Sequence, residues 1–200
     1  MKILAADMTA SQKKRIFMGM LSLFMFFGVA FGTILVIKDR DMSWVAKAVF
    51  HQNLVKSNKE QNVFRIFAGS FLPVAVMLVF QLLCGFFAFG QLLSVSTLFF
   101  RGMAGGISAS LIYLLYGIKG FAIILITLLP VMILDLYILV LGARESVKLS
   151  NTVAFYIAGK KGGDYNELRL YMLKYLVLMG FAFVSSVLDS ILTYIFIRLI

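Results

Sequence analysis

Three long stretches of this 200-residue chain carry almost no charge, and this feature constrains its fold most strongly. Ile66–Phe100 contains no charged residue at all. In Phe121–Gly142 the only charge is Asp135, and in Tyr175–Ile197 it is Asp189. An apolar run of about 18 residues or more is long enough to cross the hydrocarbon core of a bilayer as an α-helix. The sequence therefore predicts an all-α, polytopic integral membrane protein.

Composition excludes several other classes of protein. Hydrophobic residues make up 62% of the chain and charged residues 14%, whereas a soluble domain needs more polar residues to wet its exterior. The net charge of +10 arises from basic residues scattered among the predicted loops, which favours contact with anionic lipid and argues against nucleic-acid binding. The single cysteine, Cys84, and the single histidine, His51, predict neither an intrachain disulfide nor a metal site. No cofactor is expected.

Five transmembrane helices are predicted within one domain, residues 1–200. They are expected at about residues 16–37, 66–88, 102–116, 121–142 and 174–197. The run from 66 to 100 is divided because a single helix of that length would extend about 50 Å. Its more polar residues 90–97 predict a bend or an interfacial helix, and Gly117–Gly120 predicts a tight turn after the third span.

The polar stretch 38–65 contains apolar side chains at helical spacing, among them Trp44, Val45, Ala48 and Val49. This pattern predicts an amphipathic helix in the membrane interface, with Trp44 at headgroup depth. A loop helix packed on the protein itself explains the pattern equally well.

Five spans place the two termini on opposite sides of the membrane. The basic residues Lys13, Lys14 and Arg15 directly precede the first span, which favours a cytoplasmic N-terminus and an extracytoplasmic C-terminus at the cell membrane. The remaining basic residues distinguish the two sides only weakly. In this comparison of the basic residues on the two sides, Arg101 is assigned to the loop between the second and third spans.

Small residues recur one helical turn apart in two predicted spans. Gly28 and Gly32 form a G-x-x-x-G pattern in the first span, and Gly102, Gly106 and Ser110 form a longer stripe in the third. Such spacing lets helix backbones approach closely in lipid. The pattern predicts a helix-packing face within this bundle. The alternative is a contact with another chain, which would make the protein a homo-oligomer.

The candidate intramembrane polar residues are Gln81, Asp135 and Asp189. An acidic residue at the bilayer centre costs about 2.5–3.5 kcal/mol on insertion scales, so it is usually buried, paired or functional. For Asp135 we favour a protonated or hydrogen-bonded carboxyl that joins two helices, with Gln81, Ser108 or Tyr113 as its partner. The alternative is a proton or cation relay.

Asp189 belongs to a polar stripe near the end of the last span. Its neighbours on that stripe are Ser185, Ser186, Ser190 and Thr193. A stripe of this kind predicts a wet interior face of the bundle or a contact with a partner protein.

Two prolines lie within predicted spans. Pro73 and Pro130 each remove a backbone hydrogen bond, which predicts a kink in the second and fourth spans. Pro130 precedes Asp135 by five residues, so a kink there would free carbonyl groups near the carboxyl group.

Sequence motifs of enzymes are missing. The chain contains no H-E-x-x-H zinc motif, no G-x-x-x-x-G-K-[ST] nucleotide motif and no G-x-S-x-G nucleophile elbow. Asp135 and Asp189 also lack the Gly-x-Gly-Asp setting of aspartyl intramembrane proteases. We therefore predict a protein that is not an enzyme and assign no catalytic residue.

The order of these features resembles the stage II sporulation protein M family. The resemblance rests on Phe99-Phe100-Arg101-Gly102-Met-Ala-Gly-Gly106, on Gly117-Ile-Lys-Gly120, and on Leu129-Pro130 followed by the acid Asp135. Members often carry Asn-Gly-x-x-x-Gly at the start of the third span and, in the fourth, a Pro with a Glu five residues later. Here Arg101 stands where Asn is usual, Asp135 where Glu is usual, and Val131 where His often follows the proline.

The resemblance implies a non-enzymatic membrane scaffold. In endospore formers such proteins hold a peptidoglycan-degrading pair, a lytic transglycosylase and an amidase, at the septal membrane during engulfment. A small membrane transporter or an ABC-type permease subunit is the alternative reading of the same spans.

Overall fold

The computed structural model describes residues 10–38, 63–157 and 165–199, and these form helices without strands. The helices are α1 (Ala10–Lys38), α3 (Val63–Cys84), α4 (Gly90–Ile123), the π-helix η2 (Ile124–Leu128), α5 (Leu129–Ile157) and α6 (Tyr165–Leu199). They contain five segments long and apolar enough to cross a bilayer: Arg15–Lys38, Phe67–Cys84, Gly90–Leu114, Tyr116–Ile157 and Leu168–Ile195. The predicted all-α membrane fold with five spans is confirmed. Trp44 and the amphipathic segment around it lie outside the described residues.

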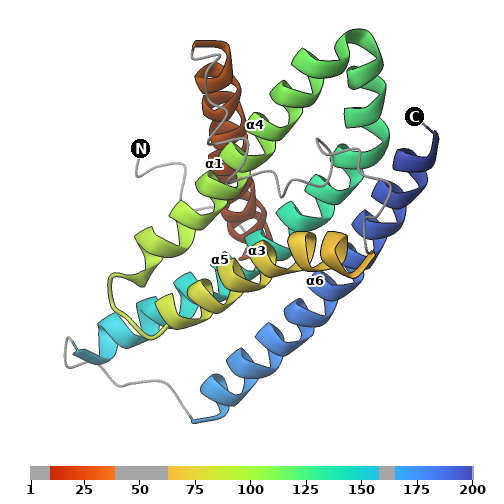
Figure 1. Cartoon of the computed structure of the whole chain (residues 1–200). Helices are drawn as coiled ribbons and strands as arrows, with labels where there is room; N and C mark the ends of the chain where they lie inside the picture. Colours follow the sequence, from red (N-terminus) through yellow and green to blue (C-terminus); the bar gives the residue numbers. More distant parts are fainter. Residues whose placement is uncertain (1–9, 39–62, 158–164, 200) are drawn as a thin grey trace.

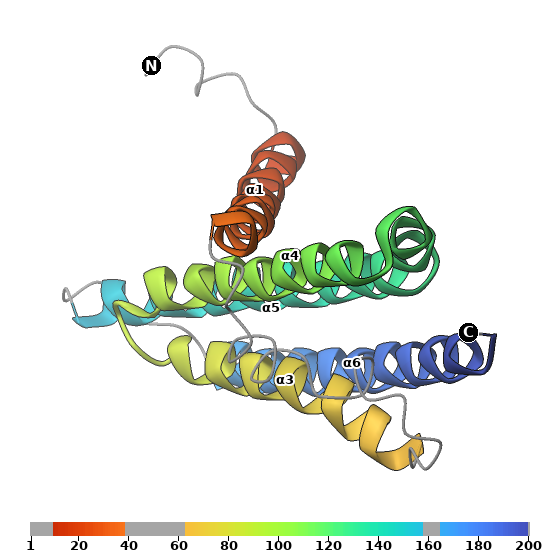
Figure 2. The ribbon, with the colours of Figure 1, turned by 45° about the horizontal axis from the view of Figure 1, so that its top comes forward.

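The helices are arranged in three layers, as Figure 2 shows. α1 lies on one outer side and crosses α4; α4 and α5 run side by side in the middle, and α3 and α6 form the other outer layer. The turn between α3 and α4 and the start of α6 lie toward one end of the bundle, with the C-terminal end of α6 at the other (Figure 1). The core is apolar: Leu78, Leu98, Leu139, Ala143 and Ala182 are fully buried.

The glycine patterns of α1 and α4 meet each other. A Cβ atom on Gly28 would collide with the carbonyl oxygen of Phe99, and one on Gly106 would collide with that of Val29. Gly32 and Gly102 meet backbone carbonyls of the facing helix in the same way, and the register shows that α1 and α4 run parallel. The predicted packing face therefore lies within this bundle. Ser110, at the end of the stripe, bonds to the Gly106 carbonyl of its own helix at 2.8 Å.

The break between the second and third spans differs from its predicted position. α3 ends at Cys84, residues 85–89 form the turn, and residues 90–97 belong to α4. The bend or interfacial helix predicted for 90–97 is therefore wrong. The inward-facing polar side chains of this segment bond to facing helices, as Ser94 does to Ser146 at 2.5 Å, whereas the exposed Ser96 bonds to the Leu92 carbonyl of its own helix. The earlier start of α4 also places Arg101 inside the span and not in a loop.

Gly117 makes the tight turn that was predicted after the third span. Its φ of 56° and ψ of −133° interrupt the helical geometry within α4. A residue with a side chain rarely adopts this φ, so glycine suits the position. The two segments around the turn pack closely, because a Cβ on Gly120 would meet the carbonyl of Ile112 at 2.5 Å.

The last two spans are longer than predicted. α5 continues past residue 142 to Ile157, and α6 begins at Tyr165 and not at residue 174. The intervening charges do not end the helices because Glu145 and Lys174 form an ion pair between α5 and α6, at 2.6 Å. Both helices therefore extend together beyond the apolar part of the bundle.

The two prolines are accommodated in different ways. The π-helix Ile124–Leu128 ends two residues before Pro130, whose ring a regular α-helix would place against the carbonyl of Ile126. The predicted disruption at Pro130 is therefore present as a widened turn. α3, by contrast, continues as a helix through Pro73.

Candidate functional site: a polar seam through the bundle

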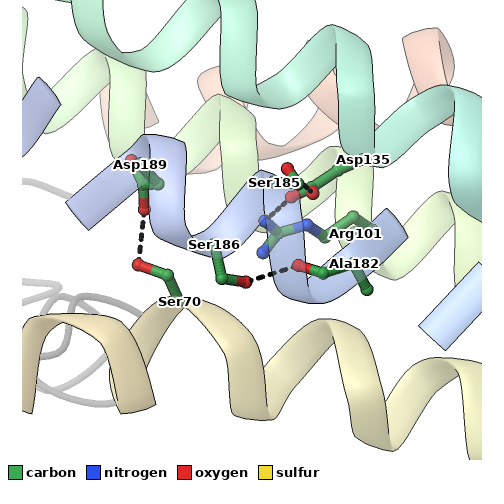
Figure 3. Close-up of polar contacts among 7 residues, drawn as sticks. All are labelled: Ser70, Arg101, Asp135, Ala182, Ser185, Ser186 and Asp189. Atoms are coloured by element: carbon green, nitrogen blue, oxygen red, sulfur yellow. Dashed lines mark hydrogen bonds and ion pairs between the residues drawn. The ribbon is translucent and has the colours of Figure 1, made fainter. Parts of the chain in front are cut away.

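Asp135, whose charge is unfavourable in a bilayer, is buried between three helices near the middle of the bundle. Its side chain on α5 is 3% exposed, and its Oδ2 atom forms an ion pair with Nη2 of Arg101 from α4 (Figure 3). Its Oδ1 atom accepts a hydrogen bond from the Ser185 hydroxyl of α6 at 3.1 Å. Both carboxylate oxygens are therefore paired, each with a different helix.

A second carboxyl group extends the site toward α3. Asp189 on α6 accepts a hydrogen bond from the hydroxyl of Ser70 on α3 (Figure 3), and it lies one helical turn beyond Ser185 on the same helix. We call Ser70, Arg101, Asp135, Ser185 and Asp189 the central charged cluster. It joins α3, α4, α5 and α6 and contains one guanidinium group for two carboxyl groups.

The depth of the cluster follows from helix geometry. The rise along α5 from Asp135 to Glu145 is about 15 Å, which is half the roughly 30 Å thickness of a hydrocarbon core. Glu145 pairs with Lys174, an ion pair that suits the interface. With the Glu145–Lys174 ion pair placed at the interface, Asp135 and Arg101 lie near the centre of the bilayer.

Uncharged polar contacts continue from the cluster toward the turn at residues 85–89. α4 and α5 are antiparallel, so Ser94 faces Ser146 at 2.5 Å, and Gln91 donates to Asn151 at 2.7 Å. At the turn itself, the Ser150 hydroxyl donates to the carbonyl of Phe87 at 2.7 Å. Together with the central charged cluster, these contacts form what we call the polar seam.

Gln81 brings α3 into the seam. It is completely buried, and its Nε2 atom donates to the hydroxyl of Thr97 at 2.6 Å and to the Leu139 carbonyl at 3.3 Å. Gly142 makes room for it, because a Cβ there would collide with Oε1 of Gln81. That oxygen has no hydrogen-bond partner among the described residues. The amide therefore links α3, α4 and α5 at one level.

Two tyrosines of α6 complete the connections between helices. The Tyr171 hydroxyl donates to the carbonyl of Leu82 in the last turn of α3, at 2.8 Å. The Tyr175 hydroxyl donates to the carbonyl of Gly142 in α5, at 2.7 Å. These bonds join α6 to α3 and to α5.

The structure confirms part of what the sequence predicts for the polar residues. Asp135 is buried and paired with other helices, but the predicted partners are wrong. Gln81 bonds elsewhere and Tyr113 is 52% exposed, whereas Arg101 and Ser185 hold the carboxylate. The polar stripe of α6 faces the interior, as predicted, with Ser185, Ser186, Ser190 and Thr193 all buried.

Arg101 is the residue that sequence reasoning missed. The signal was its spacing, because Gln91, Ser94, Thr97 and Arg101 recur at intervals of three or four residues and so share one face of a helix. The predicted third span began at residue 102, so it excluded this polar face and assigned Arg101 to a loop. A span beginning at Gly90 would have shown the whole stripe.

The polar groups of the seam hold the helices together. Within the described ranges no group of three His, Cys, Asp or Glu side chains is placed to hold a metal ion. Buried hydroxyl, amide and charged groups instead pair across helix boundaries, which replaces the hydration they lose.

Comparisons of this chain with models of protein families, with curated proteins and with solved structures give no match. The resemblance to the stage II sporulation protein M family therefore stays a hypothesis that rests on the motif residues.

Proposed function

We propose that this multi-pass protein is a non-enzymatic scaffold, a fixed helical framework that holds partner proteins at the cell membrane. The pairing of Asp135 with Arg101 and Ser185 is the observation that supports this proposal most. The charges that cost most to place in a bilayer are used to join α4, α5 and α6. A framework of this kind keeps its surface in one arrangement, which is what a scaffold requires.

The resemblance supplies the class of partner. We propose that the partners are cell-wall hydrolases, a lytic transglycosylase and an amidase, held at the septal membrane during engulfment. With a cytoplasmic N-terminus, the chain between α1 and α3 and the C-terminal end of α6 face the wall side. The basic residues Lys13, Lys14 and Arg15 before the first span support this orientation.

Co-purification tests the scaffold proposal. The full-length protein, tagged at its C-terminus, is crosslinked in its native membranes, isolated, and its partners are identified by mass spectrometry. We expect cell-wall hydrolases to be enriched over a tagged, unrelated five-span protein. Recovery of an ATP-binding subunit in their place would contradict the scaffold and support a permease.

A transporter is the second candidate, and the composition of the central charged cluster favours it. The membrane-spanning helices place two carboxyl groups, Asp135 and Asp189, in a cluster with the single guanidinium of Arg101. Acidic groups within such helices often mark ion or proton pathways. In this case the protein would be a small transporter or an ABC-type permease subunit, and its Asp135 would have to change its charge during function.

A further inference from the structure

A groove with two chemically different halves lies between α5 and α6, at the level of the Glu145–Lys174 ion pair. One half is a hollow of about 290 Å³ with an almost entirely apolar lining that includes Leu141, Leu173, Val177 and Phe181. The other half, about 150 Å³, has a mixed lining, in which the polar groups of Glu145, Lys148, Thr152 and Lys174 stand beside Leu149, Leu170 and Tyr171. The two halves share Glu145, Leu170 and Lys174 in their linings, so they adjoin at the Glu145–Lys174 ion pair.

The halves are ordered along the membrane normal. The rise along α6 from Lys174 to Phe181 is about 10 Å, directed from the interface toward the bilayer centre. One leaflet contributes about 15 Å of hydrocarbon. The apolar half therefore lies at the depth of lipid acyl chains, and the polar half at the depth of the glycerol and phosphate groups.

The polar half carries an excess of positive charge. The Glu145 carboxylate is shared, with Oε2 accepting from Nζ of Lys174 at 2.6 Å and Oε1 lying 3.6 Å from Nη2 of Arg144. Lys148 lies one helical turn further along α5 and is exposed. Among the described residues that line the polar half, Lys148 and Lys174 are basic and Glu145 is acidic, so the lining carries one more positive than negative charge and can attract an anion.

We propose that this groove binds one anionic phospholipid. Its phosphate group lies against Lys148 and Lys174, and one acyl chain follows Leu173, Val177 and Phe181 toward the bilayer centre. Charge complementarity decides the class of lipid, because basic residues near the surface attract anionic headgroups while a zwitterionic headgroup brings its own cation. The apolar half distinguishes a phospholipid from a free phosphate ion, which would use only the lysines.

Native mass spectrometry of the full-length protein tests this proposal. The protein is purified in mixed micelles with equal amounts of phosphatidylglycerol and phosphatidylcholine of the same acyl chains, and the lipids that remain bound are counted. We expect one retained phosphatidylglycerol in clear excess over phosphatidylcholine. Lys148→Gln should weaken that retention about fivefold, since each basic residue near the headgroup contributes on that order.

Two matched controls separate the groove from general effects. Lys119→Gln removes an exposed lysine near the Gly117 turn and should leave retention unchanged. Val177→Trp fills the apolar half and should reduce retention, whereas Val184→Trp, at an exposed valine outside the groove lining, should not. Equal retention of the two lipids, or equal behaviour of Lys148→Gln and Lys119→Gln, would overturn the proposal. Loss through Lys148→Gln but not Val177→Trp would overturn the acyl-chain part.

Discussion

Arg101 and Asp135 form an ion pair between α4 and α5 near the centre of the bilayer, with side chains that are 22% and 3% exposed. They come from neighbouring spans that run in opposite directions, and Ser185 of α6 holds the second carboxylate oxygen. Each charge offsets the free-energy cost of burying the other, which favours the contact between these two faces of α4 and α5.

Removing one member of the pair should destabilise the protein more than removing both. Asp135→Leu leaves the guanidinium of Arg101 without its partner, and we expect a loss of about 3 kcal/mol in the free energy of unfolding. The double variant Arg101→Leu/Asp135→Leu should lose clearly less, since neither charge then remains. Unfolding in micelles of detergent and denaturant measures the free energy of unfolding of these variants and of Arg101→Leu. If the loss in the double variant equals the sum of the two single losses, the two residues act independently.

Asp135→Asn distinguishes the scaffold from the transporter. A protonated Asp135 would tolerate asparagine, but an aspartate paired with Arg101 loses its charge in this variant, so we expect reduced stability and a lower protein level in the membrane. In a scaffold, partner recovery per molecule should stay unchanged, and engulfment should fall only in proportion to the protein level. Loss of function at normal level and normal partner recovery would instead support a charge-carrying role.

Gly106 should tolerate no side chain, because even a Cβ atom there collides with the backbone carbonyl of Val29 in α1. We expect Gly106→Ala to lower the free energy of unfolding by about 1–3 kcal/mol, as overpacking does, and Gly106→Leu to lower it further. Gly180→Ala is the matched control, since nothing lies within 4 Å of that position. Equal stability of the two alanine variants in detergent would show that α1 does not pack on α4 in this way.

The orientation of the chain is open to a direct test. In a Cys84→Ser background, a cysteine at position 162, between α5 and α6, should react with a membrane-impermeant thiol reagent only after the cells are permeabilised. A cysteine at position 119, next to the Gly117 turn, should react in intact cells. The reverse pattern would place the N-terminus outside.

Much of the fold was predictable because its signals are local. Hydropathy over one span's length needs no knowledge of the other helices, so the five spans and the Gly117 turn follow from the chain itself. The G-x-x-x-G patterns likewise predict close packing, since small residues one turn apart let helix backbones approach each other in lipid. Span ends were predicted less well, because Glu145 and Lys174 stabilise each other across two helices and so let both continue.

Sequence by itself determined that this chain forms five helices long and apolar enough to cross a bilayer and that a few polar residues are buried among them. Only the tertiary structure decided which of them meet. Ser70 and Asp189 are 119 positions apart in the chain, and Arg101 and Asp135 are 34 apart. Each helix offers several faces of nearly equal hydropathy to lipid, so the pairing depends on matching charges, hydroxyls and glycine contacts across helices, which no single segment contains.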